Sequence, residues 1–256
     1  MRQLQLDFED EFDGDSLDLT RWLPYYLPHW SSRERSRARY EVGGGELRLL
    51  IEEDQEPWCP ELDGDIRVSS LQTAEFAGPV GSEIGQHRFN SAAVVREEQQ
   101  NVRLYTPQYG RIELRCKATD DPRSMVALWM IGHGDQPERY SEICVCEIFG
   151  REVAPDHALV GVGVHPFGDP RIRDDFSKVR VPMDAREFHL YRTDWTPDQV
   201  EFFVDDNLVK TVDQSPDYPM QLMLGIYEFP ASGPNEPRGE YPKEFVVDYV
   251  RGFRLE

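Results

Sequence analysis

Short apolar runs separated by clusters of Gly, Pro and Asp/Asn recur along the whole chain. No stretch carries a long apolar repeat with the 3.6-residue period of a helix. The runs favour β-strands and span residues 4–8, 46–51, 66–71, 92–96, 110–118, 125–131, 142–149, 158–165, 188–195, 199–204, 208–212, 220–227 and 245–254. Asp205-Asp-Asn207 separates two of them and predicts a hairpin. Many short strands of this kind predict an all-β protein, an antiparallel β-sandwich or barrel.

One run, Ser141-Glu-Ile-Cys-Val-Cys-Glu-Ile-Phe-Gly150, carries two acids among apolar residues. A buried ionised carboxylate is costly unless it is paired, hydrogen-bonded or used. Strict alternation would place Glu142 and Glu147 on opposite faces of the strand, because they are an odd number of residues apart. A β-bulge near Val145 or Cys146 removes the conflict. One face then carries Glu142, Cys144, Glu147 and Phe149, and the other carries Ile143, Val145 and Ile148.

The spacing of these two acids suits a reaction. With the bulge, their Cα atoms lie roughly 13 Å apart at ~3.3 Å per strand step. Side chains that lean inward would bring the carboxyl groups to roughly 5 Å, the separation expected of a retaining glycosidase. The alternative is a strand with one solvated glutamate and one glutamate in a structural ion pair.

Composition narrows the class of substrate. The chain has 256 residues, enough for a substantial core, and a net charge of −20. This charge repels nucleic acid and anionic membrane surfaces, and it favours a neutral substrate over a polyanionic polymer. The first residues, Met-Arg-Gln-Leu-Gln-Leu-Asp, contain no apolar signal region. They predict a cytoplasmic protein, or a secreted one if the chain has been trimmed.

The four cysteines have no zinc-ligand spacing. Cys144 and Cys146 are too close in a strand to bridge each other, whereas a Cys59–Cys116 disulfide remains open.

Several ordered segments resemble glycoside hydrolase family 16, the β-glucanase and laminarinase group with a concanavalin-like jelly-roll fold. Those segments are Asp10-Glu-Phe-Asp-Gly14, Tyr109-Gly-Arg-Ile-Glu-Leu-Arg115, Ala127-Leu-Trp-Met-Ile-Gly132, Asp194-Trp-Thr-Pro-Asp198 and Val247-Asp-Tyr-Val-Arg251. The resemblance covers almost the whole length and implies one domain over residues 1–256.

The family's Glu-x-Asp-x-x-Glu signature implies the roles of the acids. Glu142 matches its nucleophile and Glu147 its acid/base, whereas Cys144 replaces the middle Asp. A thiol is mostly neutral at pH 7 and bonds weakly, so the loss of a negative charge removes one force that raises the pKa of Glu147. We therefore expect an altered pH optimum or a slower turnover.

Aromatic and polar residues near the acids are candidates for sugar binding. The resemblance places Trp129 near the cleft, and Tyr25, Tyr26, Trp30 and Trp58 lie in loop-like sequence. His165 ends the strand that follows the acids, and Tyr227 and Glu228 end a later strand. Packing in the core is an equal alternative for each aromatic, and a structural histidine is the alternative for His165. The run Arg33, Arg35, Arg37 and Arg39 predicts a solvated face.

The resemblance implies no required cofactor, but it allows a structural calcium ion. The matching positions are Glu11, a carbonyl near Gly44, and Asp248, and oxygen ligands suit calcium. Ordinary capping or ion pairs are the alternative for the two acids.

Together these features predict a retaining hydrolase acting on a neutral β-glucan with β-1,3 or mixed β-1,3/1,4 linkages. Its partner would be a neutral polysaccharide or oligosaccharide, and the oligomeric state stays open. A transglycosylase and a non-catalytic carbohydrate-binding protein are the alternatives.

Overall fold

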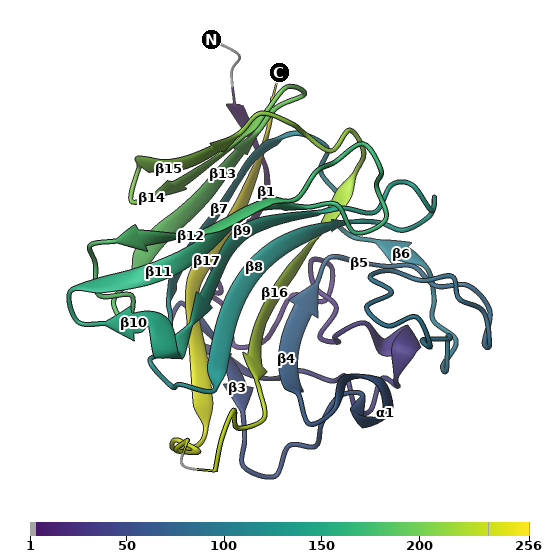
Figure 1. Ribbon diagram of the computed structural model, residues 1–256, viewed down its shortest axis with the longest axis horizontal. Coiled ribbons are helices and arrows are strands. Elements are labelled where there is room, and N and C mark those ends of the chain that lie inside the picture. Colours follow the sequence, from purple (N-terminus) through teal and green to yellow (C-terminus); the bar gives the residue numbers. More distant parts are fainter. Residues whose placement is uncertain (1–3, 235, 256) are drawn as a thin grey trace.

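Two antiparallel sheets pack face to face in the computed structural model, which describes residues 4–234 and 236–255. The back sheet contains, in order, β15 (Asn207–Val212), β14 (Val200–Val204), β13 (His189–Trp195), β7 (Gly110–Lys117), β17 (Lys243–Leu255), β3 (Glu46–Ile51) and β2 (Arg39–Gly43). β1 (Leu4–Asp10) pairs with the C-terminal part of β17, so the first and last strands lie side by side (Figure 1).

The second sheet, called the cleft sheet below, lies in front of the back sheet in Figure 1. Its order is β10 (Val153–Ala154), β11 (His157–His165), β9 (Glu142–Phe149), β8 (Ser124–Gly132), β16 (Met220–Glu228) and β4 (Arg67–Gln72), and β12 (Asp175–Val181) also pairs with β11. Outside both sheets lie η1 (Pro28–Trp30), α1 (Pro60–Asp63), the pair β5 (Ala74–Glu75) and β6 (Val102–Arg103), and η2 (Gly150–Glu152). Figure 1 shows α1, β5 and β6 gathered beside β4, at one edge of the cleft sheet.

The apolar faces of the two sheets form the main core. Leu47 and Leu114 of the back sheet and Val126 and Leu224 of the cleft sheet are fully buried in it. A second apolar cluster lies on the other face of the cleft sheet, where loops containing Tyr26, Trp30 and Trp58 cover Trp129 and Tyr227 of β8 and β16. The cleft sheet is therefore buried on both faces at this edge, and polar groups there need partners or a function.

The strand pattern of the sequence is largely confirmed, and so is the hairpin. Asp205 and Asp206 both have positive φ (47° and 63°), as a two-residue hairpin turn requires. Among the strands that the structure describes, the sequence pattern missed β2 and β12, because their charged residues interrupt the apolar alternation, and the two-residue strands β5, β6 and β10.

The prediction of a strand at residues 92–96 is wrong. Ala93 and Val95 are buried and Val94 is exposed, which imitates strand alternation. The amides of Val95 and Arg96, however, donate to the carbonyls of Ser82 and His29 in other loops. The segment packs on the second cluster without joining a sheet.

The open Cys59–Cys116 disulfide does not form. All four cysteines are free and buried. Cys116 lies between the two sheets, whereas Cys59 lies in the loop cluster and donates to the carbonyl of Trp30. Within the part of the chain that the structure describes, no helix is long and apolar enough to cross a membrane.

Candidate active site

The central strand β9 contains the bulge that the sequence predicts. Against β8, Cys146 lies opposite Leu128 and Cys144 lies opposite Trp129, so Val145 has no partner. Against β11, Glu147 lies opposite Gly161 and Cys144 lies opposite Gly163. Three steps on β9 therefore match two steps on β11, and one residue is extra.

This extra residue decides where each side chain of β9 points. Val145 and Cys146 both enter the core between the sheets, together with Ile143 and Ile148. Glu142, Cys144 and Glu147 line a single pocket on the opposite face, as the bulge predicts. The two acids thus share a face despite their odd spacing.

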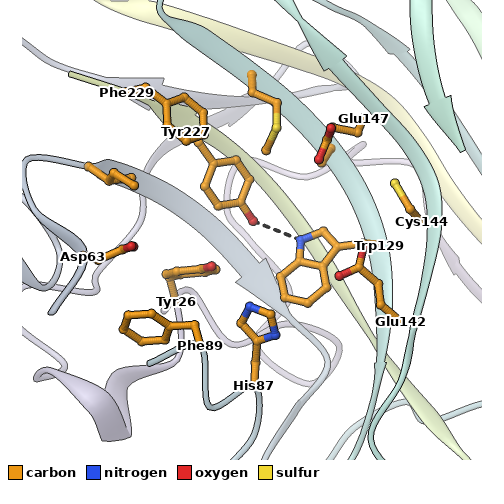
Figure 2. A pocket seen from close by; sticks show the side chains of 13 residues that line it. Tyr26, Asp63, His87, Phe89, Trp129, Glu142, Cys144, Glu147, Tyr227 and Phe229 are labelled. Atoms are coloured by element: carbon orange, nitrogen blue, oxygen red, sulfur yellow. Dashed lines mark hydrogen bonds between the residues drawn. The ribbon is translucent and has the colours of Figure 1, made fainter. Parts of the chain in front are cut away.

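The pocket has a volume of about 220 Å³, and five aromatic rings contribute to its walls. Figure 2 shows the two glutamates on one side and Tyr26, Phe89 and Asp63 on the other, with Trp129 and Tyr227 between them. The indole Nε1 of Trp129 donates to the hydroxyl of Tyr227 at 3.0 Å, which fixes both rings. Apolar ring faces with few polar groups are typical of a small-molecule site.

Burial and mutual repulsion change the protonation of the acids. Burial, and then the charge of Glu147, raises the pKa of Glu142 to about 8. Burial also raises the pKa of Glu147, although the positive charges of Lys178, His165 and Arg151 act against it. At neutral pH the protonated form of Glu142 is therefore favoured, and its titration is coupled to the charge of Glu147.

Cys144 lies between the acids as a neutral thiol. It is 2% exposed, and burial followed by the charges of Glu142 and Glu147 raises its pKa well above the usual value. Its Sγ donates a weak hydrogen bond to the carbonyl oxygen of Gly161 at 3.7 Å.

The far side of the acids is formed by β11 and β12. His165 lies directly opposite Glu142, stacks on Phe176 and bonds to Asp174 through Nδ1 (2.6 Å). Gly161 makes room here, since a Cβ would lie 2.6 Å from the ring of Phe176 and 3.2 Å from Cβ of Glu147. His165 thus flanks the acids and lies outside the aromatic pocket.

The expected sugar-binding aromatics divide into two groups. Trp129, Tyr26 and Tyr227 line the pocket. Trp30 and Trp58 are fully buried behind it, where Trp30 donates to the carbonyl of Gln86 and Trp58 to the carboxylate of Asp63. The structure does not bring these two tryptophans to the pocket surface, because their indole N–H groups bond to Gln86 and Asp63.

Glu228 also lies away from the pocket. It is 1% exposed and lies next to a cluster of cationic side chains. Its carboxylate is 3.3 Å from Nζ of Lys243 and 3.2 Å from Arg67, and it accepts a hydrogen bond from Tyr241. The adjacent Tyr227 takes the pocket face, because neighbouring strand residues point in opposite directions.

The arginines of the run 33–39 form ion pairs or lie against an aromatic ring. Arg35 pairs with Glu61, and Arg39 pairs with Glu52 and Asp54, while Arg33 and Arg37 lie against the ring of Tyr25. All four arginines lie outside the pocket lining.

Both acids among the calcium candidates are paired with arginines. Glu11 forms a two-point pair with Arg251 (2.6 and 3.0 Å), and Asp248 pairs with Arg115. Within the described ranges, no group of three His, Cys, Asp or Glu side chains is arranged to hold a metal ion. The carboxylates that calcium would need are neutralised by arginines, so they do not fit a calcium ion in this arrangement.

Sequence reasoning missed four polar or aromatic residues of the pocket, Asp63, His87, Phe89 and Phe229. Phe89 and His87 come from the loop between β5 and β6, and Asp63 ends α1. Burial raises the pKa of Asp63, whose carboxylate accepts from Trp58 at 2.7 Å. These positions lie in irregular segments, where strand periodicity carries no information.

Two carboxyl groups with raised pKa values that line one pocket with aromatic rings are typical of the class of glycoside hydrolases. A sequence profile described as "Glycosyl hydrolases family 16" matches residues 99–251, more than half of the chain. The chain belongs to glycosyl hydrolases family 16, which confirms the family expected from the sequence.

Individual relatives agree with this placement. The chain is 28% identical to a "Beta-glucanase" of Rhodothermus marinus over 98% of its own length and 85% of that protein. It matches the structure of a GlcNAcα1-4Gal-releasing endo-β-galactosidase from Clostridium perfringens with a TM-score of 0.85 and 31% identity. That match covers 98% of this chain, which spans 62% of the clostridial chain. A laminarinase structure from Rhodothermus marinus matches over 100% of this chain and 99% of that chain, with a TM-score of 0.69 and 22% identity, which confirms the jelly-roll sandwich.

Proposed function

We propose that this protein is a retaining glycoside hydrolase that cleaves a neutral β-linked glycan, with a β-glucan as the first candidate substrate. The observation that carries the proposal is the bulge at Val145, which turns Glu142 and Glu147 into one aromatic pocket. Without this extra residue the two acids would face opposite sides of the sheet.

In the proposed reaction, the carboxylate of Glu142 attacks the anomeric carbon of the sugar. The glycosidic C–O bond breaks as Glu147 gives its proton to the departing oxygen. In the second step the carboxylate of Glu147 takes a proton from water, whose oxygen attacks the anomeric carbon and releases Glu142. Two inversions retain the configuration.

The charges around the acids influence which of the two is protonated. The reaction needs the proton of the pair on Glu147 and the negative charge on Glu142. In the resting protein, burial and the charge of Glu147 raise the pKa of Glu142 to about 8, whereas the cations near Glu147 oppose the rise in its own pKa. The proposal therefore expects a bell-shaped pH dependence whose two limbs belong to the coupled pair.

A β-glucan substrate is supported by the β-glucanase relative and by the aromatic rings that line the pocket. The net charge of −20 works against long polyanionic substrates.

A β-galactoside is the second candidate substrate. The clostridial endo-β-galactosidase agrees with this chain more closely, in both backbone and sequence, than the Rhodothermus laminarinase does. Glucose and galactose differ only in the orientation of one hydroxyl group, so the residues of the pocket wall would decide between them.

A substrate panel tests the proposal. Purified protein is incubated with linkage-defined β-1,3-, mixed β-1,3/1,4- and β-1,4-glucans and with β-galactans, and reducing ends are measured. We expect release from one class, with retained configuration of the new anomeric centre by NMR. Glu142→Gln and Glu147→Gln are expected to abolish it.

The panel also separates the alternatives. Longer products at high oligosaccharide concentration indicate a transglycosylase. Binding of an oligosaccharide without release, in the wild type as in both glutamine variants, indicates a carbohydrate-binding protein and would contradict the proposal.

A further inference from the structure

His87 lines the pocket from the loop between β5 and β6, and nothing in the mechanism above uses it. Its imidazole centroid lies 5.1 Å from the ring of Trp129 and 5.0 Å from that of Phe167. Figure 2 shows the imidazole pointing into the space between Tyr26 and Trp129. The ring thus forms part of the wall beside the catalytic acids.

His87 is a polar group without a partner. Its Nδ1 atom is buried and has no hydrogen bond to the residues that the structure describes. Burial lowers the pKa of His87 to about 4, so the ring is neutral at ordinary pH and carries one donor and one acceptor. Buried polar atoms normally have partners, and a missing partner in a pocket indicates a group that enters with the ligand.

His29 in the same molecule shows what a structural histidine looks like. It is fully buried, and both ring nitrogens are partnered, Nδ1 with Glu75 (2.6 Å) and Nε2 with the carbonyl of Gln86 (3.1 Å). His87 lacks such a set, so a purely structural role does not account for it.

The backbone holds His87 in a strained conformation. Its φ of +45° is uncommon for a residue with a side chain. The preceding Gln86 is fully buried and anchored on both sides. Its carbonyl accepts from Trp30 Nε1 (2.7 Å), and its side-chain oxygen accepts from the amide of Phe76 (3.1 Å).

Gly85 lets this anchor form. A Cβ at Gly85 would lie 2.7 Å from the ring of His29 and 2.8 Å from that of Trp30. Strained residues held by a surrounding network are concentrated at binding sites. Trp30, expected from the sequence to bind sugar, thus supports the loop that presents His87.

We propose that His87 determines which sugar the pocket accepts, by exchanging hydrogen bonds with hydroxyl groups of the neutral sugar unit that packs against Trp129. A neutral imidazole suits hydroxyl groups, which donate and accept in the same way. The inference rests on the proposed function and identifies a specificity residue of the same pocket.

Three variants test this inference. His87→Gly removes the ring at a φ that glycine adopts freely, so the loop keeps its conformation. His87→Asn keeps a donor and an acceptor and tolerates positive φ. Val80→Ala, an exposed position of the same loop, is the matched control.

Kinetics on the best substrate and on its epimer give the readout. We expect His87→Gly to lower kcat/KM about tenfold, mainly through KM, and to change the ratio between glucan and galactan substrates. His87→Asn should recover part of the loss, and the thermal midpoint of each variant should match that of Val80→Ala. An unchanged KM and substrate ratio in His87→Gly would overturn the inference.

Binding separates this inference from the proposed function. If the wild type releases no reducing ends, hydrolysis is rejected. Tryptophan fluorescence then measures oligosaccharide binding to Glu142→Gln and to the double variant that also carries His87→Gly. Weaker binding in the double variant supports the role of His87. Equal binding, or none in either protein, rejects it.

Discussion

The thiol of Cys144 donates to the carbonyl oxygen of Gly161, on the strand beside it. This bond directs the thiol hydrogen to the sheet backbone. Cys144 and the two glutamates on either side of it all line the pocket. The position at which the family signature has an aspartate thus carries no charge at neutral pH, because burial raises the pKa of the thiol. The protonation of the acids then depends on burial, on each other and on the cations of β12 and η2.

Replacing Cys144 by aspartate should shift the pH dependence of the reaction. A carboxylate between the two glutamates disfavours their ionised forms, so both limbs of the pH–rate profile should move upward by roughly 0.5 to 1 unit. The profile of kcat/KM for Cys144→Asp checks this, with the uncharged Cys144→Asn as control. Coincident limbs in the wild type and Cys144→Asp would defeat the electrostatic argument.

Glu142 should make the folded protein less stable at high pH. Burial and Glu147 raise its pKa from 4.5 to about 8 in the folded state. The folded state therefore holds the proton longer, and the resulting stability is full below pH 4.5 and lost as the pH rises through about 8. The free energy of unfolding of Glu142→Gln should exceed that of the wild type by on the order of a few kcal/mol at pH 8. At pH 4.5 the difference should be much smaller.

Urea unfolding at the two pH values measures this difference. Glu138→Gln, an exposed acid on the preceding loop, is the control and should show no such pH dependence. The same gap between Glu142→Gln and the wild type at both pH values would contradict the linkage.

Loss of the Glu228 carboxylate should affect folding and leave substrate binding unchanged. Lys243 is 3% exposed and lies 2.6 Å from Asp121 and 3.3 Å from Glu228. Glu228→Gln leaves this buried cation with less compensation, which should cost roughly 3 kcal/mol of unfolding free energy. Chemical denaturation and KM are measured together.

An exposed pair provides the comparison for Glu228. Asp120→Asn breaks a surface pair with Arg186 and should cost no more than about 1 kcal/mol. A raised KM in Glu228→Gln without loss of stability would restore the role in substrate binding that the sequence suggested.

Removal of divalent ions should leave the protein unchanged. Since Arg251 and Arg115 neutralise Glu11 and Asp248, EDTA should shift the thermal midpoint by no more than about 1 °C. Differential scanning calorimetry with EDTA, and then with excess calcium, checks this. A thermal midpoint that falls with EDTA and recovers with calcium would contradict this prediction. It would show that the two carboxylates leave the arginines and bind the ion.

The bulge was predictable because its cause is local. An apolar strand with two acids at odd spacing has few ways to keep both acids out of the core, and one extra residue is the simplest of them. Positions 92–96 show the opposite case, in which alternating burial on a loop imitates a strand. Periodicity records which side chains are buried, and it does not say whether the backbone finds a partner strand.

Taken alone, the chain's sequence determined the all-β class, the positions of most strands along the chain and the acids on a common face, because strand periodicity and the conflict between the two acids depend on neighbouring residues. Only the tertiary structure decided that Glu228 joins a buried ion cluster, that Trp30 supports a loop, and that His87 enters the pocket. Each of these outcomes depends on partners many residues away, such as Lys243 for Glu228 and Gln86 for Trp30. Hydrogen bonds and ion pairs of this kind form only after the sheets have brought their loops together.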